Sequence, residues 1–373
     1  MLKNQMPGVV VRTDASLLIG SGHVMRCLTL AKSLRSSGLK VEFVCRVLSG
    51  NLIDIIQGNN FFVHKLSGSE FIKNNDISNY EIKNKYSKWL GVSLDQDAEE
   101  TVMALQGKNP EWLVVDHYGI DKSWELYMRP HVGNIMVIDD LVNRKHDCNL
   151  LLDQNYSLGN KKRYQDLVPK FCKILLGPKF SLLRPEFWQA RKLLKPKKRE
   201  VKKVFVFFGG TDPNNISSLA LEALSTPLLS HLKVDLAIGI NNPHRKKIEF
   251  QVSSRKRTRL HVQIENISEL MACSDLALGA GGSTTWERMC VGLPSIVFAL
   301  ADNQLPASKA LYRDGFIRYI DGRGEISVKQ LQNIILDYIN HPQERFQHSI
   351  KGMQLVDGQG VKQVKEIMFT NLN

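Results

Sequence analysis

The sequence lacks the features of a secreted, metal-binding or membrane-spanning protein. Only six of its 373 residues are cysteine, and they are scattered without CxxC or Cys/His pairs. This scatter predicts reduced thiols and argues against a zinc site or a disulfide framework. No apolar run approaches the roughly 20 residues of a membrane span, and the first residues contain no apolar signal-peptide core. We therefore expect a cytoplasmic protein with no metal, no cofactor and no stable membrane insertion.

Acidic residues are also fewer than basic ones, 37 against 50, which gives a formal net charge of +13. Such a balance is typical of proteins that meet nucleic acid, acidic lipid or an anionic small molecule. Much of the excess lies in a basic run at residues 191–203, just before an apolar strand. No interleaved aromatic residues or RNA-binding signature accompany this run, so we expect no nucleic-acid partner. We interpret the run as a solvated linker, with a membrane-surface role as the next alternative.

The length and the pattern of apolar segments predict two α/β domains, because 373 residues are too many for one compact core. One series of alternating strand-like and helix-like segments precedes the basic run, and a second series follows it. This pattern is typical of two parallel α/β domains. We place the domains at residues 1–180 and 203–373, with a linker at 181–202 and a surface loop at 67–88. Strands are expected near 7–13, 40–45, 61–66, 111–115, 134–138, 148–152, 203–208, 232–239, 275–278 and 294–298, and helices near 23–36, 95–106, 215–224, 283–291, 303–313 and beyond 327.

A glycine-containing turn in the first domain carries the leading catalytic candidate, His23. The turn follows an apolar strand and opens a helix, where free backbone N–H groups can meet an anion. Arg12 and Asp14 lie at the carboxyl end of the same strand, and Asp14 is the carboxylate nearest in sequence that could orient a general base. The spacing is not GxGxxG, so it does not favour a dinucleotide. The alternative is that His23 is an ordinary polar residue in a first helical turn.

Two further glycine turns lie in the second domain, at residues 209–215 and 279–287. Each follows an apolar strand and precedes a helix, so bare backbone amides can approach a diphosphate closely. The second turn adds Glu287 about one helical turn inside the helix. A carboxylate accepts hydrogen bonds from vicinal hydroxyls, so Glu287 suits a ribose. Alternatively, Glu287 only favours the helix N-terminus through the helix dipole.

The series Gly-Gly, Thr, Glu and Gly-x-Pro in residues 281–294 resembles the nucleotide-binding half of GT-B glycosyltransferases, notably the one that makes lipid II. Motifs along nearly the whole chain are similar to those of the UDP-2,4-diacetamido-2,4,6-trideoxy-β-L-altropyranose hydrolase family (PseG family) of pseudaminic acid biosynthesis. They are RTDAS at 12–16, IGSGH at 19–23, RC at 26–27, WLGV at 89–92, DHYG at 116–119, IDD at 138–140, LLDQN at 151–155, LLGP at 175–178, LRPEF at 183–187 and ADNQ at 301–304, together with the two glycine turns.

This resemblance implies a role for each matching residue. His23 would activate a water molecule, while Asp14 and the turn from Gly20 to Gly22 would set its position. The substrate would be bound by Arg12, Gly20, Gly22, His117, Tyr118 and Arg184. The diphosphate would be bound by Gly210, Thr211, Gly281, Gly282, Ser283 and Thr284, the ribose by Glu287, and the nucleotide-sugar junction by Asn303 and Gln304. His117 and Tyr118 could instead be ordinary loop packing, and Arg184 could pair with an acidic residue. Many relatives carry a histidine near the position of Tyr86.

The resemblance further implies a GT-B fold, with two Rossmann-like domains facing across a cleft that closes by a hinge at 177–203. The family hydrolyses its UDP-sugar without metal, by water attack at the anomeric carbon. It acts on the way to CMP-pseudaminic acid, which serves glycosylation of flagellin or surface polysaccharide. We expect a monomer with enzymes of the same pathway as its partners. A GT-B glycosyltransferase would use the same UDP site but pass the sugar to an acceptor. A nucleic-acid-binding protein would explain the charge and leave the glycine turns without purpose.

Overall fold

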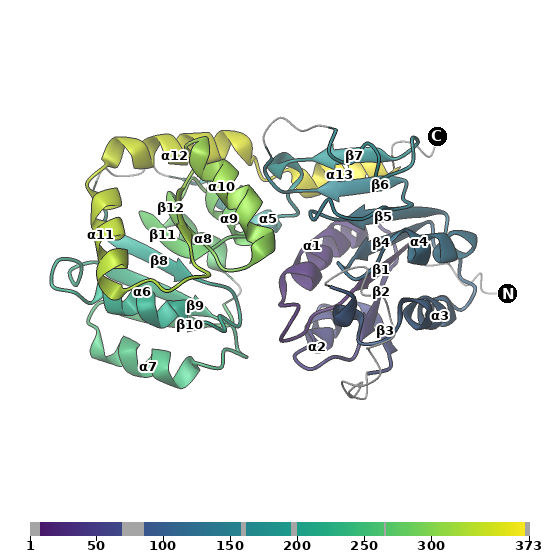
Figure 1. Ribbon diagram of the computed structural model, residues 1–373, viewed down its shortest axis with the longest axis horizontal. Helices are drawn as coiled ribbons and strands as arrows, with labels where there is room; N and C mark the ends of the chain where they lie inside the picture. Colours follow the sequence, from purple (N-terminus) through teal and green to yellow (C-terminus); the bar gives the residue numbers. More distant parts are fainter. Residues whose placement is uncertain (1–7, 69–85, 158–161, 195–199, 265, 370–373) are drawn as a thin grey trace. The chain divides into compact units, whose positions relative to one another are not determined.

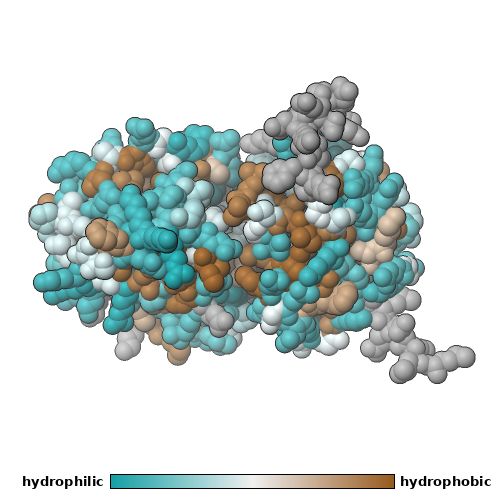
Figure 2. All heavy atoms as spheres, turned by 90° about the horizontal axis from the view of Figure 1, so that it is seen from below, coloured by the Kyte–Doolittle hydropathy of each residue, from teal (hydrophilic) through white to brown (hydrophobic). Residues whose placement is uncertain are grey.

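The computed structural model describes residues 8–68, 86–157, 162–194, 200–264 and 266–369. Within them the chain forms two compact units, each built on one sheet (Figure 1). The first takes its described residues from Met1–Gln154, Gly159–Leu182 and Val361–Asn373, and the second from Asn155–Leu158 and Leu183–Gly360. In these described ranges, no helix combines the length and the apolar character that crossing a membrane requires. Figure 2 shows hydrophilic residues over most of the drawn face and apolar residues in patches among them.

The sheet of the first unit has seven parallel strands in the order β3-β2-β1-β4-β5-β6-β7. They are β1 (Val9–Thr13), β2 (Val41–Arg46), β3 (Phe62–Leu66), β4 (Trp112–Asp116), β5 (Asn134–Ile138), β6 (Leu150–Asp153) and β7 (Lys173–Leu176). Every residue of the central strands β1 and β4 is buried. Burial on both faces is the reason that these strands are nearly continuous apolar runs rather than alternating patterns.

Helices cover both faces of this sheet. One face packs against α1 (Gly22–Ser36), α2 (Ile53–Gly58) and α13 (Gly360–Phe369), and the other against α3 (Leu94–Leu105) and α4 (Lys122–Met128). Successive side chains of β1 point to opposite faces of the sheet. Val9 and Val11 therefore pack in the core with α1, α2 and α13, and Val10 packs in the core with α3 and α4. Short 3-10 helices complete the unit at η2 (Ser87–Leu90), η3 (Arg129–His131) and η4 (Pro178–Phe180).

The second unit has a six-stranded parallel sheet in the order β10-β9-β8-β11-β12-β13. Its strands are β8 (Lys203–Phe207), β9 (Lys233–Ile238), β10 (Thr258–Val262), β11 (Leu276–Ala280), β12 (Ser295–Ala299) and β13 (Arg318–Asp321). The helical elements are α5 (Pro185–Lys192), α6 (Ile216–Leu224), α7 (Arg245–Ser254), α8 (Ile267–Ala272), α9 (Ser283–Cys290), η5 (Asp302–Gln304), α10 (Leu305–Arg313), α11 (Val328–Ile339) and α12 (Pro342–Leu355). One apolar core includes side chains of α6 and α11, and the other includes side chains of α5, α8 and α9.

Both sheets reverse their strand order next to a glycine turn. In the first unit the reversal lies between β1 and β4, where Thr13 pairs with Asp116. In the second it lies between β8 and β11, the strands that precede the two glycine turns of that unit. Open parallel sheets bind ligands outside the carboxyl ends of their strands at such a reversal. The topology therefore brings the candidate residues of each unit to one edge of its sheet.

The predicted fold class of two parallel α/β domains is confirmed, and several elements differ from the prediction. The strands β7, β10 and β13 and the helices α2, α4, α5, α7 and α8 were not anticipated. The segment expected to be a solvated linker contains α5, because Pro185 can occupy the first helical turn and Phe187 is fully buried. Residues Val361–Phe369 pack with the first unit, although they were assigned to the second domain. The expected loop at 67–88 lies mostly outside the described residues, which resume at Tyr86 and include η2.

Candidate active site

His23 lies in the first turn of α1, just after the loop that follows β1. The loop folds back on itself, since Ser16 and Gly20 form an isolated bridge and the Ser16 hydroxyl accepts the N–H of Ile19 at 3.0 Å. Gly20 has a φ of +81°, in the left-handed region that glycine adopts without a steric penalty. The chain then enters α1 at Gly22, so that His23 lies beyond the carboxyl end of β1 and is only 8% exposed.

Asp116, the last residue of β4, holds the His23 ring. His23 Nδ1 and Asp116 Oδ1 are 2.6 Å apart. Burial opposes ionisation of this carboxyl, but the charge of Arg26 and the hydrogen bonds from Arg26 and His23 outweigh it and hold the pKa of Asp116 well below its ordinary value. Because Asp116 is ionised, Nδ1 must donate the hydrogen bond, and the neutral ring then has its free lone pair on Nε2. This is the tautomer that a general base requires.

Arg26 and Cys27 of α1 complete the contacts of Asp116. Arg26 donates to both carboxylate oxygens, from Nε to Oδ2 and from Nη2 to Oδ1, each at 2.6 Å. The Cys27 thiol lies 3.4 Å from Oδ2. Burial raises the pKa of Cys27, and the negative charge of Asp116 raises it further, so this cysteine is a thiol rather than a reactive thiolate.

Asp14 differs from the expectation that it would orient His23. Its Oδ1 accepts the backbone N–H of Arg46 at 2.7 Å and lies 2.8 Å from the Arg12 guanidinium. Arg46 ends β2, on the side of β1 opposite to β4, so these contacts hold Asp14 on that side while His23 bonds to Asp116. Arg12 itself is fully buried and also donates to Asp97 at 2.6 Å. The structure therefore places Arg12 and Asp14 in a buried ion-pair network beneath the site.

His117 is buried as well, at 3% exposure. Its Nδ1 accepts the N–H of Gly119 at 3.0 Å, so the proton of the neutral ring is on Nε2, which lies 3.6 Å from Asp14 Oδ2. Burial lowers the pKa of His117 to about 4, against the opposing effect of Asp14. This histidine is neutral at physiological pH, and its contacts are those of a packed loop residue, the alternative that the sequence left open.

Aromatic side chains pack around His23. The Tyr118 ring meets the His23 ring edge-on, with centroids 4.6 Å apart, and stacks on Trp89 at 5.3 Å. Tyr86 packs against both Trp89 and Tyr118. The Tyr118 hydroxyl donates to Asp140 Oδ1 at 2.5 Å. Burial raises the pKa of Tyr118, and Asp140 raises it further, so the hydroxyl stays a neutral donor.

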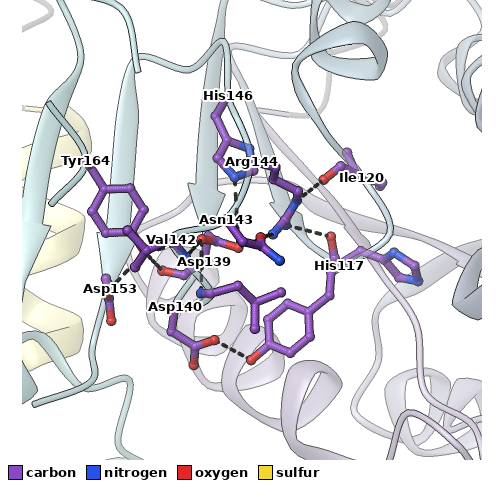
Figure 3. A network of polar contacts seen from close by, with 12 residues as sticks. His117, Ile120, Asp139, Asp140, Val142, Asn143, Arg144, His146, Asp153 and Tyr164 are labelled. Atoms are coloured by element: carbon purple, nitrogen blue, oxygen red, sulfur yellow. Dashed lines mark hydrogen bonds and ion pairs between the residues drawn. The ribbon is translucent and has the colours of Figure 1, made fainter. Parts of the chain in front are cut away.

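The loop after β5 positions Asp140, as Figure 3 shows. Asp139 is turned toward Arg144 and lies 2.6 Å from its Nη1, while the Tyr164 hydroxyl donates to the Asp139 carbonyl at 2.8 Å. His146 Nδ1 is 2.7 Å from Glu125 Oε1. These contacts anchor both ends of the loop, and Asp140 Oδ1 accepts the hydrogen bond from the Tyr118 hydroxyl.

The first glycine turn of the second unit follows β8. Gly209 has a φ of +99°, and the Gly210 carbonyl accepts the N–H of Gly239 at 3.0 Å, so the turn packs against the end of β9. Asp212 is buried and accepts the first two amides of α6, from Ile216 at 3.0 Å and Ser217 at 2.8 Å. This carboxylate therefore stabilises the turn and the start of the helix. Phosphate binding by Gly210 and Thr211 stays a prediction.

The second glycine turn leads into α9. Gly281 packs closely, because a Cβ there would lie 3.0 Å from Ser308 Oγ and 3.2 Å from Gln304 Oε1. Gly282 is the N-cap of α9, with a φ of +113°, and it has no side chain to accept amides of the first turn, where Ser283 and Thr284 lie. A helix start without a side-chain cap is suited to an anion.

Gln304 and Asn303 lie in η5, next to this turn in the second unit. Gln304 Oε1 accepts the N–H of Leu300 at 2.9 Å, which holds the segment after β12 in place. Asn303 is half-buried. Their expected contacts with the nucleotide-sugar junction stay predictions.

Glu287 lies on α9 near Arg184, the residue before α5. Arg184 Nη2 and Glu287 Oε1 are 3.6 Å apart, so the arginine has the acidic neighbour that the sequence left open as an alternative. Burial raises the pKa of Glu287, although Arg184 opposes this rise. A carboxylate whose ionised form is disfavoured by burial is stabilised by hydroxyl donors, so Glu287 is suited to a ribose.

Sequence reasoning missed Arg288, which is 1% exposed. Its Nη2 donates to the Ala280 carbonyl at 2.9 Å and to the Thr285 hydroxyl at 3.1 Å. Burial lowers the pKa of Arg288 to about 10. The guanidinium thus holds the glycine turn from beneath. Helical periodicity places Arg288 on the buried side of α9. This pattern could have predicted its burial, but it is a weak signal in so short a helix.

Asp116, Arg26 and Trp89 were also missed as site residues, although each lies in a motif of the family resemblance. The signal for Asp116 was its place at the end of the strand that neighbours β1. Among the residues that the structure describes, no three His, Cys, Asp or Glu side chains are grouped so that they could hold a metal ion.

Comparisons with known proteins place this geometry in a family. The glycosyltransferase family 28 C-terminal domain matches residues 204–364. The chain is 30% identical over 310 residues to the UDP-2,4-diacetamido-2,4,6-trideoxy-beta-L-altropyranose hydrolase of Campylobacter jejuni, and this alignment covers 83% of the chain and 97% of that protein. It is 26% identical over 368 residues to the spore coat polysaccharide biosynthesis protein SpsG of Bacillus subtilis, covering 96% of the chain and 97% of that protein.

Solved structures show the same fold. MurG of Acinetobacter baumannii aligns over 97% of this chain and 99% of its own, with a TM-score of 0.62 and 12% identity. The spinosyn rhamnosyltransferase SpnG aligns over 96% of this chain and 99% of its own, with a TM-score of 0.65 and 14% identity. The prediction of a GT-B fold is thereby confirmed. The chain belongs to the same family as the Campylobacter jejuni hydrolase.

Proposed function

We propose that this protein hydrolyses UDP-2,4-diacetamido-2,4,6-trideoxy-β-L-altropyranose and releases UDP. The relative of that name is 30% identical and is matched over 97% of its length, which supports the same reaction here. The observation that carries the proposal is the 2.6 Å contact between His23 and Asp116, which supplies an oriented general base. In this role the enzyme acts on the way to CMP-pseudaminic acid.

In the proposed reaction, a water molecule attacks the anomeric carbon while its proton passes to His23 Nε2. The bond between the anomeric carbon and the phosphate oxygen breaks, and UDP leaves with the electron pair of that bond. UDP is already a good leaving group, so the protein must stabilise diphosphate charge rather than supply a strong acid. The start of α9, with Ser283 and Thr284, is suited to that charge. Asp116 stabilises the imidazolium as it forms, and a single displacement inverts the anomeric centre.

Hydrolysis of a panel of UDP-sugars, followed by NMR of the products, tests the substrate. The diacetamido-trideoxy sugar should be released fastest, and its first-formed anomer should be inverted. Reaction in ¹⁸O-labelled water tests the bond that breaks, since attack at carbon leaves the released UDP unlabelled. Label in UDP would contradict the mechanism.

A UDP-sugar glycosyltransferase is the second candidate, favoured by the match to the family 28 C-terminal domain. It would use the nucleotide-binding turns in the same way but would transfer the sugar to an acceptor. The two candidates differ in one observable. Free sugar that accumulates without any acceptor supports hydrolysis, whereas UDP release that depends on an added acceptor supports transfer.

A further inference from the structure

Asp116 is the point on which the charged groups of the candidate active site converge. Its side chain is fully buried, and three contacts of 2.6 Å reach it, one from His23 Nδ1 and two from Arg26. Oδ1 is shared between His23 and Arg26 Nη2, while Oδ2 accepts from Arg26 Nε and lies near the Cys27 thiol. Arg26 and His23 therefore interact with the same oxygen.

We infer that Arg26 is a positioning residue for His23. Its two hydrogen bonds fix the plane of the Asp116 carboxylate toward His23 Nδ1, and its positive charge offsets the negative charge that would otherwise favour the protonated ring. The kinetic part of this inference rests on the proposed function, whereas the electrostatic part rests on the geometry of the first unit alone. A planar guanidinium suits this role because its parallel N–H groups match both oxygens of one carboxylate.

The electrostatic step follows from the distances. A buried carboxylate 2.6 Å from an imidazole, without a compensating cation, favours the protonated ring. A ring that is already protonated cannot take a proton from water. Arg26 Nη2 lies 3.2 Å from His23 Nδ1, close enough for its positive charge to disfavour the imidazolium. Its side chain is 9% exposed, so water screens this interaction only weakly.

Other titratable groups face this cluster from each neighbouring element. They are Cys27 from α1, Arg12 and Asp14 from the end of β1, Asp97 from α3, His117 and Tyr118 from the end of β4, and Asp139 and Asp140 from the end of β5. Burial keeps the Cys27 thiol and the Tyr118 hydroxyl protonated, and it keeps His117 neutral. Arg12 is paired with Asp14 and Asp97. Arg26 is thus the cation that bears directly on the pairing of His23 with Asp116.

NMR titration of the histidine ring protons in the full-length protein tests the electrostatic part without substrate. A His23→Asn variant identifies the His23 signal among the ten histidines. Arg26→Met removes the cation and leaves Asp116 to favour the imidazolium, so the titration midpoint of the His23 ring should rise by about one pH unit or more. Arg26→Lys keeps the positive charge but loses the paired hydrogen bonds to both Asp116 oxygens. We expect a smaller upward shift of the His23 titration midpoint in this variant.

Arg35→Met is the matched control, because Arg35 is an exposed arginine of the same helix. It should leave the His23 midpoint in place. A midpoint in Arg26→Met that stays or falls would overturn the inference. If Arg26→Met does not fold, Arg26→Lys decides, and the absence of any upward shift in that variant overturns the inference equally.

The pH dependence of UDP release tests the kinetic part. The acid limb of kcat/KM should move upward in each variant by the same increment as the NMR midpoint. If Arg26 had a purely structural role, its replacement would lower the maximal kcat/KM without moving the acid limb of the pH profile. That result would contradict a positioning role. If the wild-type protein releases UDP from no UDP-sugar, the proposed function fails, and the NMR titration still decides the inference about Arg26.

Discussion

Asp116 determines which nitrogen of His23 can act as a base. The 2.6 Å contact fixes the ring orientation and puts the Nδ1 proton on the carboxylate side. Replacement of His23 by Asn should therefore lower the rate of UDP release by about 10² to 10⁴, the range for loss of a general base. UDP affinity should change no more than a few-fold, because the proposed nucleotide-binding turns lie in the second unit. Steady-state kinetics and calorimetry check both values, and near-normal turnover would remove His23 from the catalytic role.

Glu287 offers a second test at the scale of a residue. Glu287→Ala should weaken UDP and the UDP-sugar together, by about 1 to 3 kcal/mol if a charged hydrogen bond to ribose is lost. Glu222→Ala, on an exposed part of α6 in the same unit, serves as the control. Calorimetry with UDP decides the question. Unchanged affinity in a folded Glu287→Ala protein would leave this residue only a helix-dipole role.

At the scale of the element, the turn after β8 depends on one carboxylate. Asp212 accepts the amides of Ile216 and Ser217 with separate oxygens, although it has a φ of +41°. Asp212→Ala should cost about 1 kcal/mol of local stability, in the range of a lost N-terminal cap. Amide exchange at Ile216 and Ser217 should then accelerate about fivefold, while amides of α7 serve as the internal control. Unchanged exchange would mean that other groups hold the start of α6.

The sequence predicted the elements that carry a strong apolar pattern and missed those that depend on tertiary contacts. The strand at Val9–Thr13 and the helix at Gly22–Ser36 were predicted within two residues. Helix α5 was missed because it is short and only one of its side chains, Phe187, is buried. The pairing of His23 with Asp116 spans 93 residues, and only the strand order brings the two together. His23 could therefore be found from local pattern, whereas its partner required the fold.

At the scale of the whole molecule, the two units differ in their buried carboxylates. In the first unit, burial opposes ionisation of Asp97, but Arg12 and Arg46 outweigh it and hold its pKa at about 2. The pKa values of Asp116 and Asp139 are also lowered. In the second unit, burial raises the pKa of Glu287, whereas Lys203 and His261 outweigh burial at Asp235 and lower its pKa. Burial also raises the pKa of Asp140 in the first unit, but the pKa values of Glu42 and Glu100 there are lowered as well. The first unit therefore depends on more charged carboxylates than the second.

We accordingly expect the first unit to lose stability before the second as the pH falls. A carboxyl whose folded pKa is lowered contributes stability that is present above its unfolded value, near 3.9, and is lost as the pH falls through the folded value. For Asp97 alone this contribution is about 2 kcal/mol, since one pKa unit corresponds to about 1.4 kcal/mol. Amide exchange in β1 and β4 should therefore accelerate between about pH 5 and pH 2, while exchange in β8 and β11 changes less over the same interval. Equal acceleration in both units, or earlier loss of the second, would contradict the assignment of the acid-sensitive charges to the Asp97 and Asp116 networks.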